Sequence, residues 1–185
     1  MAGRISRRKL DRMMQASTRA SMTEKEWQAR MKCVAYHEAA HAVVAYSHGG
    51  GDVDGISLVP DLRWMGIAYT RRKVSDAPAV LMAGMLAETK LTGKPFIELL
   101  REKQDDADGG AVNDWSDLLE TQRQYPDEIN VATGIWWARE LLDQPENWAA
   151  VEALAAALLE KEKLTGKQAR RIIEQAQRDV ESSEE

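Results

Sequence analysis

The stretch from Thr23 to Ser47 predicts one long helix, and this helix constrains the fold more than any other segment. Thr23 and Glu26 have the spacing of a capping box, in which each residue bonds to the other's backbone at a helix start. Glycines at 49–51 predict where the helix ends. Apolar residues on both sides of the segment H-E-A-A-H indicate that the middle of the helix is buried.

Within that segment, His37 and His41 are four residues apart, so a helix places both imidazoles on one face, where they can bind the same metal ion. Glu38 can reach a water molecule at that ion without being a ligand. This pattern is typical of zinc-dependent peptide hydrolysis. Two core histidines that bind nothing would have the same spacing. We favour a metal site, because a helix core seldom holds two histidines and a glutamate within one turn.

Composition predicts a folded cytoplasmic protein. A chain of 185 residues with 44% hydrophobic residues and six tryptophans can bury a core as a single domain. Its single cysteine excludes an internal disulfide framework and fits a reducing compartment. No apolar run approaches the roughly 20 residues that a transmembrane helix needs. No apolar segment follows the basic residues at the start, so no secretory signal is expected.

We divide the chain into three parts. They are a basic arm at 1–22, a single peptidase-like domain at 23–181, and a tail at 182–185 that should fray. Residues 1–32 hold nine Lys or Arg against three acids, although the whole chain carries a net charge of −5. A basic arm on an acidic body can contact nucleic acid, anionic lipid or an acidic partner. A solvated tail, or packing of the arm on its own domain, is the commoner arrangement. We therefore do not predict nucleic acid as a partner.

The rest of the chain predicts a mainly α fold with a small antiparallel β-sheet (α+β). Two β-favouring runs flank a proline-containing connection, and after them the pattern is helical except for a loop rich in Asp and Gly. The expected strands are 53–59 and 65–71, the expected loop is 105–110, and the expected helices are about 76–91, 95–103, 114–124, 127–142, 146–163 and 166–181.

Taken in order, five segments resemble the peptidase domain of the FtsH-type membrane AAA+ zinc proteases, over roughly residues 34–173. That resemblance implies the family's fold, with a small sheet beside the metal helix and a helical C-terminal half. Each match is weak by itself, but their shared order is specific. The segments are 36–42 (Y-H-E-A-A-H-A), 53–60 with 65–67, 83–88 (A-G-M-L-A-E), 110–114 (G-A-V-N-D) and 154–173.

The resemblance implies a role for each matched residue. His37 and His41 would be ligands of Zn2+, the implied cofactor, and Glu38 the general base. Asp114 matches the family's third ligand, although a plain helix N-cap is the alternative that its sequence context favours. Glu88 matches a glutamate near the zinc, where it would orient a ligand histidine. An ordinary surface position is the alternative for Glu88.

The second expected strand offers a way to bind substrate. Its residues Met65, Gly66, Ile67, Ala68 and Tyr69 would pair with an extended peptide by adding a strand at the sheet edge. A purely structural edge strand is the alternative. Tyr69 and His48 are the candidates for an additional donor to the oxyanion.

These features predict a zinc-dependent endopeptidase that acts on peptides and on unfolded or flexible polypeptide, with no ATPase or membrane anchor in this chain. The resemblance leaves open a homo-oligomer and a separate ATPase or docking partner. Ala40 stands where the family has glycine, and Met85 stands where it has arginine. These departures leave room for an inactive pseudo-peptidase that serves as an adaptor. A second alternative is a regulatory zinc protease that cuts one specific partner, with the basic arm as the docking element.

Overall fold

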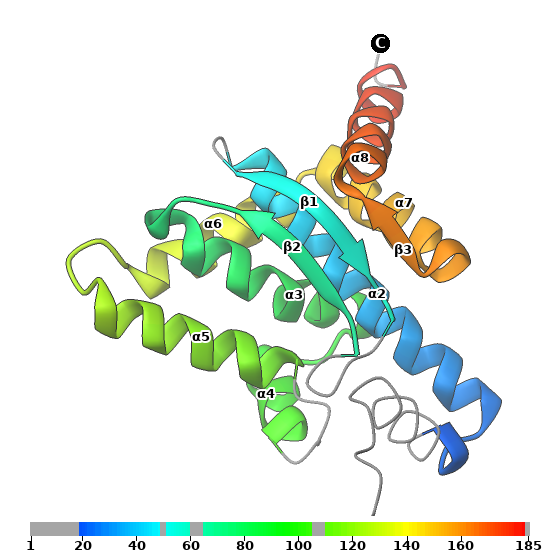
Figure 1. Ribbon diagram of the computed structural model, residues 1–185, viewed down its shortest axis with the longest axis horizontal. Helices are drawn as coiled ribbons and strands as arrows, with labels where there is room; N and C mark the ends of the chain where they lie inside the picture. Colours follow the sequence, from blue (N-terminus) through cyan, green and yellow to red (C-terminus); the bar gives the residue numbers. More distant parts are fainter. Residues whose placement is uncertain (1–18, 49–50, 60–64, 105–109, 184–185) are drawn as a thin grey trace, which may run out of the picture.

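The computed structural model describes residues 19–48, 51–59, 65–104 and 110–183. Helix α2 (Glu24–Ser47) crosses the molecule beneath the small sheet, and the other helices surround it (Figure 1). The remaining elements are β1 (Asp52–Ser57), β2 (Ile67–Arg71), the 3-10 turn η1 (Val74–Asp76), α3 (Ala77–Thr92), α4 (Phe96–Gln104), α5 (Gly110–Gln124), α6 (Val131–Asp143), α7 (Pro145–Lys161), β3 (Lys163–Thr165) and α8 (Gly166–Glu181).

The mainly α fold with a small antiparallel sheet is confirmed. Within the described residues the sheet has the order β2-β1-β3, so β1 is central. Strand β3 was not predicted, and the helix expected over 146–163 ends instead at Lys161. The reversal occurs at Glu162, which has the left-handed φ of 59°, and it places Leu164 opposite Ile56 in the sheet. A charged residue in that conformation leaves no glycine signal in the sequence.

The long helix forms as predicted, and its middle is buried. Thr23 and Glu26 make the expected capping box, with the Thr23 amide donating to Glu26 over 2.7 Å. Every residue from 37 to 45 is buried. The alanines among these residues are small and allow neighbouring elements to approach closely, and α2 contacts α3, α7 and both β1 and β2. No helix in the described part of the chain is long and apolar enough to cross a membrane.

Helix α3 is buried from Ala77 to Glu88 because it lies between other helices, with contacts to α2, α5 and α6. Its contact with α6 depends on Gly134. A Cβ atom on that glycine would lie 2.1 Å from Pro78 Cβ and 2.9 Å from the backbone nitrogen of Ala79. The position of α3, which faces the histidine pair of α2, therefore depends on a helix that is remote in sequence.

We expect Gly134→Ala to lower the free energy of unfolding by about 1–3 kcal/mol, because the added methyl group must displace buried backbone. Urea denaturation followed by circular dichroism would measure it. Thr133→Ala, at the exposed neighbouring position of α6, is the matched control and should change stability by about 0.5 kcal/mol or less. Equal effects of the two variants would show that α3 and α6 are not held in close contact by the glycine.

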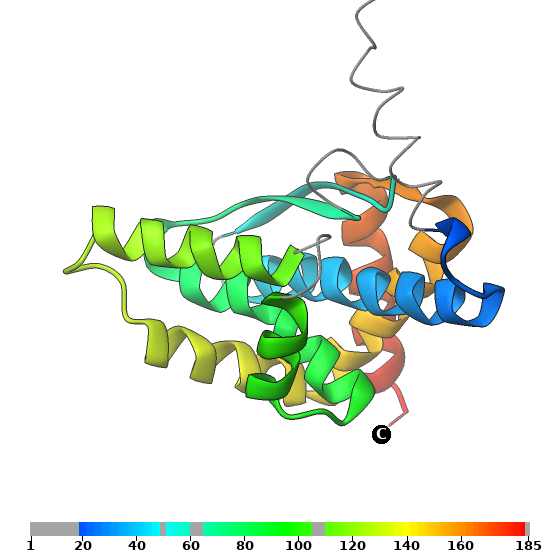
Figure 2. The ribbon, with the colours of Figure 1, turned by 90° about the horizontal axis from the view of Figure 1, so that it is seen from below.

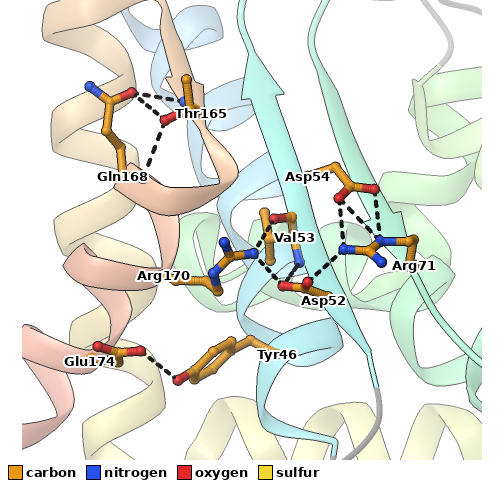
Figure 3. Close-up of polar contacts among 9 residues, drawn as sticks. All are labelled: Tyr46, Asp52, Val53, Asp54, Arg71, Thr165, Gln168, Arg170 and Glu174. Carbon is orange, nitrogen blue, oxygen red and sulfur yellow. Dashed lines mark hydrogen bonds and ion pairs between the residues drawn. The ribbon is translucent and has the colours of Figure 1, made fainter.

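Polar contacts join α8 to the sheet and to α2 (Figure 3). Arg170 of α8 reaches Asp52 at the start of β1, and Glu174 accepts a 3.0 Å hydrogen bond from the Tyr46 hydroxyl. Thr165 and Gln168 form a second capping box, which begins α8. Helix α6 begins at Val131 rather than at 127, because the Asn130 side chain caps it by accepting from the Thr133 amide.

Candidate metal centre

The two histidines of the motif lie together in the interior, one turn apart on α2. Their rings are edge-on, with centroids 4.6 Å apart and planes at 80°. His37 is 5% exposed and His41 is 7% exposed, so both sit in the core rather than on the surface. The predicted placement of both imidazoles on one helix face is confirmed.

Asp114 completes a three-residue cluster although it is more than 70 positions away in sequence. Its Oδ2 atom lies 2.9 Å from His37 Nε2 and 3.2 Å from His41 Nε2. One prediction about this segment was wrong, because α5 begins at Gly110 rather than at 114. Asp114 therefore projects from within a helix and is not its N-cap. The rest of the predicted loop, 105–109, lies outside the described residues.

Helix α3 holds the other side of both imidazoles. His41 Nδ1 donates to the Val80 carbonyl over 2.6 Å, and His37 Nδ1 lies 2.8 Å from Glu88 Oε1. Each Nδ1 therefore has its own acceptor, which leaves both Nε2 atoms facing Asp114. The structure thus brings Glu88, 3% exposed, to the histidine pair, and it is not a surface residue.

Gly84 was not singled out from the sequence, yet it makes room for His37. A Cβ atom at this position would lie 2.5 Å from both Cε1 and Nε2 of the His37 ring. Val80, Gly84 and Glu88 recur every fourth residue, so they form one face of α3 opposite the histidines. The signal available in the sequence was a glycine, Gly84, midway between Val80 and Glu88 on the same helix face.

Glu38 is 7% exposed and lies beside Gly66, the residue that precedes β2. A Cβ atom on Gly66 would come within 2.7 Å of Glu38 Cγ and 3.0 Å of its Oε1. Burial raises the pKa of the Glu38 carboxyl, and His37 and His41 oppose this rise only in part. A carboxylate with a raised pKa is a stronger base than one in water, which suits it to accept a proton.

The cluster has strongly shifted pKa values in the absence of a metal ion. Burial lowers the pKa of His37, but the hydrogen bonds and charges of Asp114 and Glu88 outweigh burial and raise it to about 10. Burial raises the pKa of Asp114, but His41 and His37 outweigh it and hold that pKa well below its usual range. The pKa values of His37 and Asp114 are thus shifted in the directions that favour their opposite charges.

A cleft opens beside the cluster and is lined by parts of α2, β2, α3 and α5. Figure 2 shows α5 below strands β1 and β2, with α2 running beneath the sheet. From the expected substrate strand, Gly66, Ile67 and Ala68 line this cleft. Met65 is buried elsewhere and Tyr69 is 55% exposed, and neither belongs to the lining. Strand β2 begins at Ile67, two residues later than predicted.

Five lining residues were not identified from the sequence, the apolar Val80 and Leu81 and the polar Thr70, Arg72 and Asp117. Thr70 and Arg72 follow Ala68 at alternate positions, so strand geometry turns all three side chains to one side. His48, one candidate for an oxyanion donor, lies away from the cleft, with its ring 5.6 Å from that of Trp137. Neither His48 nor Tyr69 is placed to assist at this site.

The donor atoms of the cluster suit zinc. Two imidazole nitrogens and a carboxylate oxygen, all within 4.8 Å of one another, are the ligand types of catalytic zinc sites. A tetrahedral zinc ion with bonds of about 2.0–2.1 Å holds its ligand atoms roughly 3.3 Å apart. The distances of 2.9 Å and 3.2 Å from Asp114 to the two rings are close to that spacing.

Comparison with known proteins gives one partial relationship. No protein family model matches this chain. The chain is 35% identical over 91 residues to the ATP-dependent zinc metalloprotease FtsH of Magnetococcus marinus. The match covers 42% of this chain and 13% of that protein's length. Together with the His-His-Asp cluster, this partial match suggests an FtsH-like relationship.

Proposed function

We propose that this protein is a zinc-dependent endopeptidase that hydrolyses peptide bonds in unfolded or flexible polypeptide. The observation that carries the proposal is the convergence of His37, His41 and Asp114 on one point, with Glu38 beside them in an open cleft. The partial similarity to a protein named as a zinc metalloprotease supports the same activity.

In this proposal the Nε2 atoms of His37 and His41 and the carboxylate of Asp114 hold the zinc ion. Zinc bound there would polarise the scissile carbonyl and lower the pKa of water to about 7. The chain's residues fix how the ligands point. Glu88 and the Val80 carbonyl hold the two Nδ1 protons, so the imidazoles cannot turn away from the ion.

Glu38 acts as the general base. Its buried carboxylate takes a proton from the attacking water and later delivers that proton to the leaving amine. The raised pKa of Glu38 favours both transfers, because a group with a pKa nearer to neutrality gains and loses protons more readily.

Strand β2 supplies the surface for the substrate. It pairs with β1 along one edge only, among the described residues, so an extended peptide can add at the other edge. Main-chain pairing needs an extended segment, and folded proteins seldom expose one. This requirement is why we assign unfolded or flexible polypeptide as the substrate class.

The metal site is tested by zinc content. We expect His41→Ala to reduce bound zinc from about one ion per chain to almost none, because a catalytic zinc site needs three protein ligands. Mass spectrometry of purified, desalted protein would measure the metal directly. His48→Ala is the matched control, since it removes a histidine at the C-cap of the same helix, outside the cluster.

Two results would contradict the proposal. One is wild-type protein that takes up no zinc from a stoichiometric solution, and the other is His41→Ala protein that binds zinc as well as wild type. Cleavage of an unfolded casein-type substrate, lost with a chelator and restored by zinc, would connect the metal to peptide hydrolysis.

A further inference from the structure

Arg72 brings a positive charge into the cleft that the proposed reaction does not use. It follows the last residue of β2 and lies on the same side as Ala68 and Thr70, while Arg71 faces the other way. Among the lining residues that the structure describes, Arg72 is the only lysine or arginine. The other charged or titratable lining residues are Glu38, His41, Asp114 and Asp117.

The described part of the protein offers the Arg72 guanidinium few hydrogen-bond acceptors and no ion-pair partner. In the described part of the chain its one hydrogen bond is a long contact of 3.4 Å to the Thr70 hydroxyl, and it makes no ion pair there. Burial lowers the pKa of this guanidinium, although Asp114 and Asp117 oppose that effect. Arg72 nevertheless keeps an exposed surface, so a molecule that enters the cleft can reach it.

We propose that Arg72 recognises a carboxylate of the substrate and gives the peptidase a preference for acidic residues, or for a free C-terminus, near the scissile bond. This inference rests on the function proposed above. A guanidinium presents parallel N–H donors that match the two oxygens of a carboxylate. The Ala68 backbone is hydrogen-bonded to Glu38, and Arg72 follows Ala68 by four residues, or about 13 Å of extended strand. The recognised group therefore lies within a few residues of the bond that is cut.

The Asp117 carboxylate competes with a substrate carboxylate for the positive charge of Arg72. It lines the same cleft and interacts electrostatically with Arg72, without being close enough for an ion pair. A substrate carboxylate that approaches Arg72 must therefore overcome repulsion from Asp117. Removing the Asp117 charge should strengthen the preference for acidic substrates, whereas a purely structural role of Arg72 would predict no change.

The test uses quenched fluorescent peptides that are neutral except for one Glu, which is moved through each position around the cleavage site. Each peptide has a partner with Gln in place of Glu, and each is made with a free or an amidated C-terminus. We expect kcat/KM to be about 10- to 100-fold higher with the carboxylate at one position, as for a hydrogen bond to a charged group. The Gln partners and the amides separate side-chain recognition from recognition of a terminus.

Arg72→Gln should abolish this preference, so that each Glu peptide is cleaved no faster than its Gln partner. Arg72→Lys should keep part of it, because a point charge remains. Asp117→Asn should increase it. Arg71→Gln is the matched control: it removes the same charge from the adjacent residue, whose guanidinium is bound to Asp52 and Asp54 on the other side of the strand (Figure 3).

Binding separates this inference from the proposed function. The same peptides would be titrated into Glu38→Gln protein, and fluorescence anisotropy would give their dissociation constants. Cleavage by wild type with no dependence on charge, or a preference that persists in Arg72→Gln, would overturn the role of Arg72 and leave the peptidase proposal intact. Absence of cleavage by zinc-loaded wild type would overturn the peptidase, and charge-selective binding that is lost in Arg72→Gln would still support Arg72.

Discussion

Glu38→Gln is expected to lower the rate of peptide cleavage by about 10²- to 10⁴-fold, the usual contribution of a general base. Glutamine has the same size as glutamate, so the contact with Gly66 is kept, but its amide cannot accept and return a proton. Zinc should remain bound at one ion per chain, because Glu38 does not belong to the His37, His41 and Asp114 cluster. Steady-state kinetics and metal analysis on the same preparation would measure both quantities.

This variant also separates an enzyme from an inactive adaptor. A pseudo-peptidase would bind zinc and lack activity in both forms, whereas a peptidase would lose activity only in the variant. Glu140→Gln, an exposed position on α6, is the control for the chemical change and should cleave as wild type does. Undiminished cleavage by Glu38→Gln would remove Glu38 from the mechanism even if zinc were essential.

Gly84→Ala is expected to lower zinc affinity by about 10- to 100-fold or more, as seen when a neighbour that orients a ligand is changed. The added methyl group would lie 2.5 Å from the His37 ring, which is buried and cannot move aside while still bonding Glu88 and Asp114. The same overlap should lower the free energy of unfolding by about 1–3 kcal/mol. Competition with a chromogenic chelator and urea denaturation would measure the two effects.

A second variant shows whether the imidazole is the cause. In protein that already carries His37→Ala, the methyl group added by Gly84→Ala has no imidazole ring to collide with. It should then be neutral or stabilise by up to about 1 kcal/mol, because alanine favours a helix over glycine. Equal destabilisation in both backgrounds would mean that the methyl group collides with something other than His37.

Local sequence was sufficient where the signal and its effect lie within one element. The capping boxes at Thr23 and Thr165 both formed, because each depends on residues three positions apart. The alignment of His37 and His41 followed from the pitch of the helix alone. The start of α5 was harder to predict. The glycines at 109 and 110 suggested a loop, but the helix begins at Gly110, so Asp114 lies within it.

Contacts between elements were harder to predict. Strand β3 was missed because its formation depends on pairing with β1, more than 100 residues earlier, and on a left-handed Glu162. Glu88 and Asp114 entered through resemblance to a family, since a carboxylate on one helix carries no sign of the histidine it will meet on another. Gly84 and Arg72 went unnoticed because a glycine in a helix and an arginine after a strand are common in ordinary sequences.

By itself, therefore, the sequence determined a mainly helical chain with a histidine pair and a glutamate on one buried helix, because helical periodicity is a local property. Tertiary structure alone decided that Asp114 meets both imidazoles, that α3 fixes their other nitrogens, and that β2 and α5 enclose a cleft beside them. Those features depend on distances between segments far apart in the chain, and only the packing of the whole fold sets such distances.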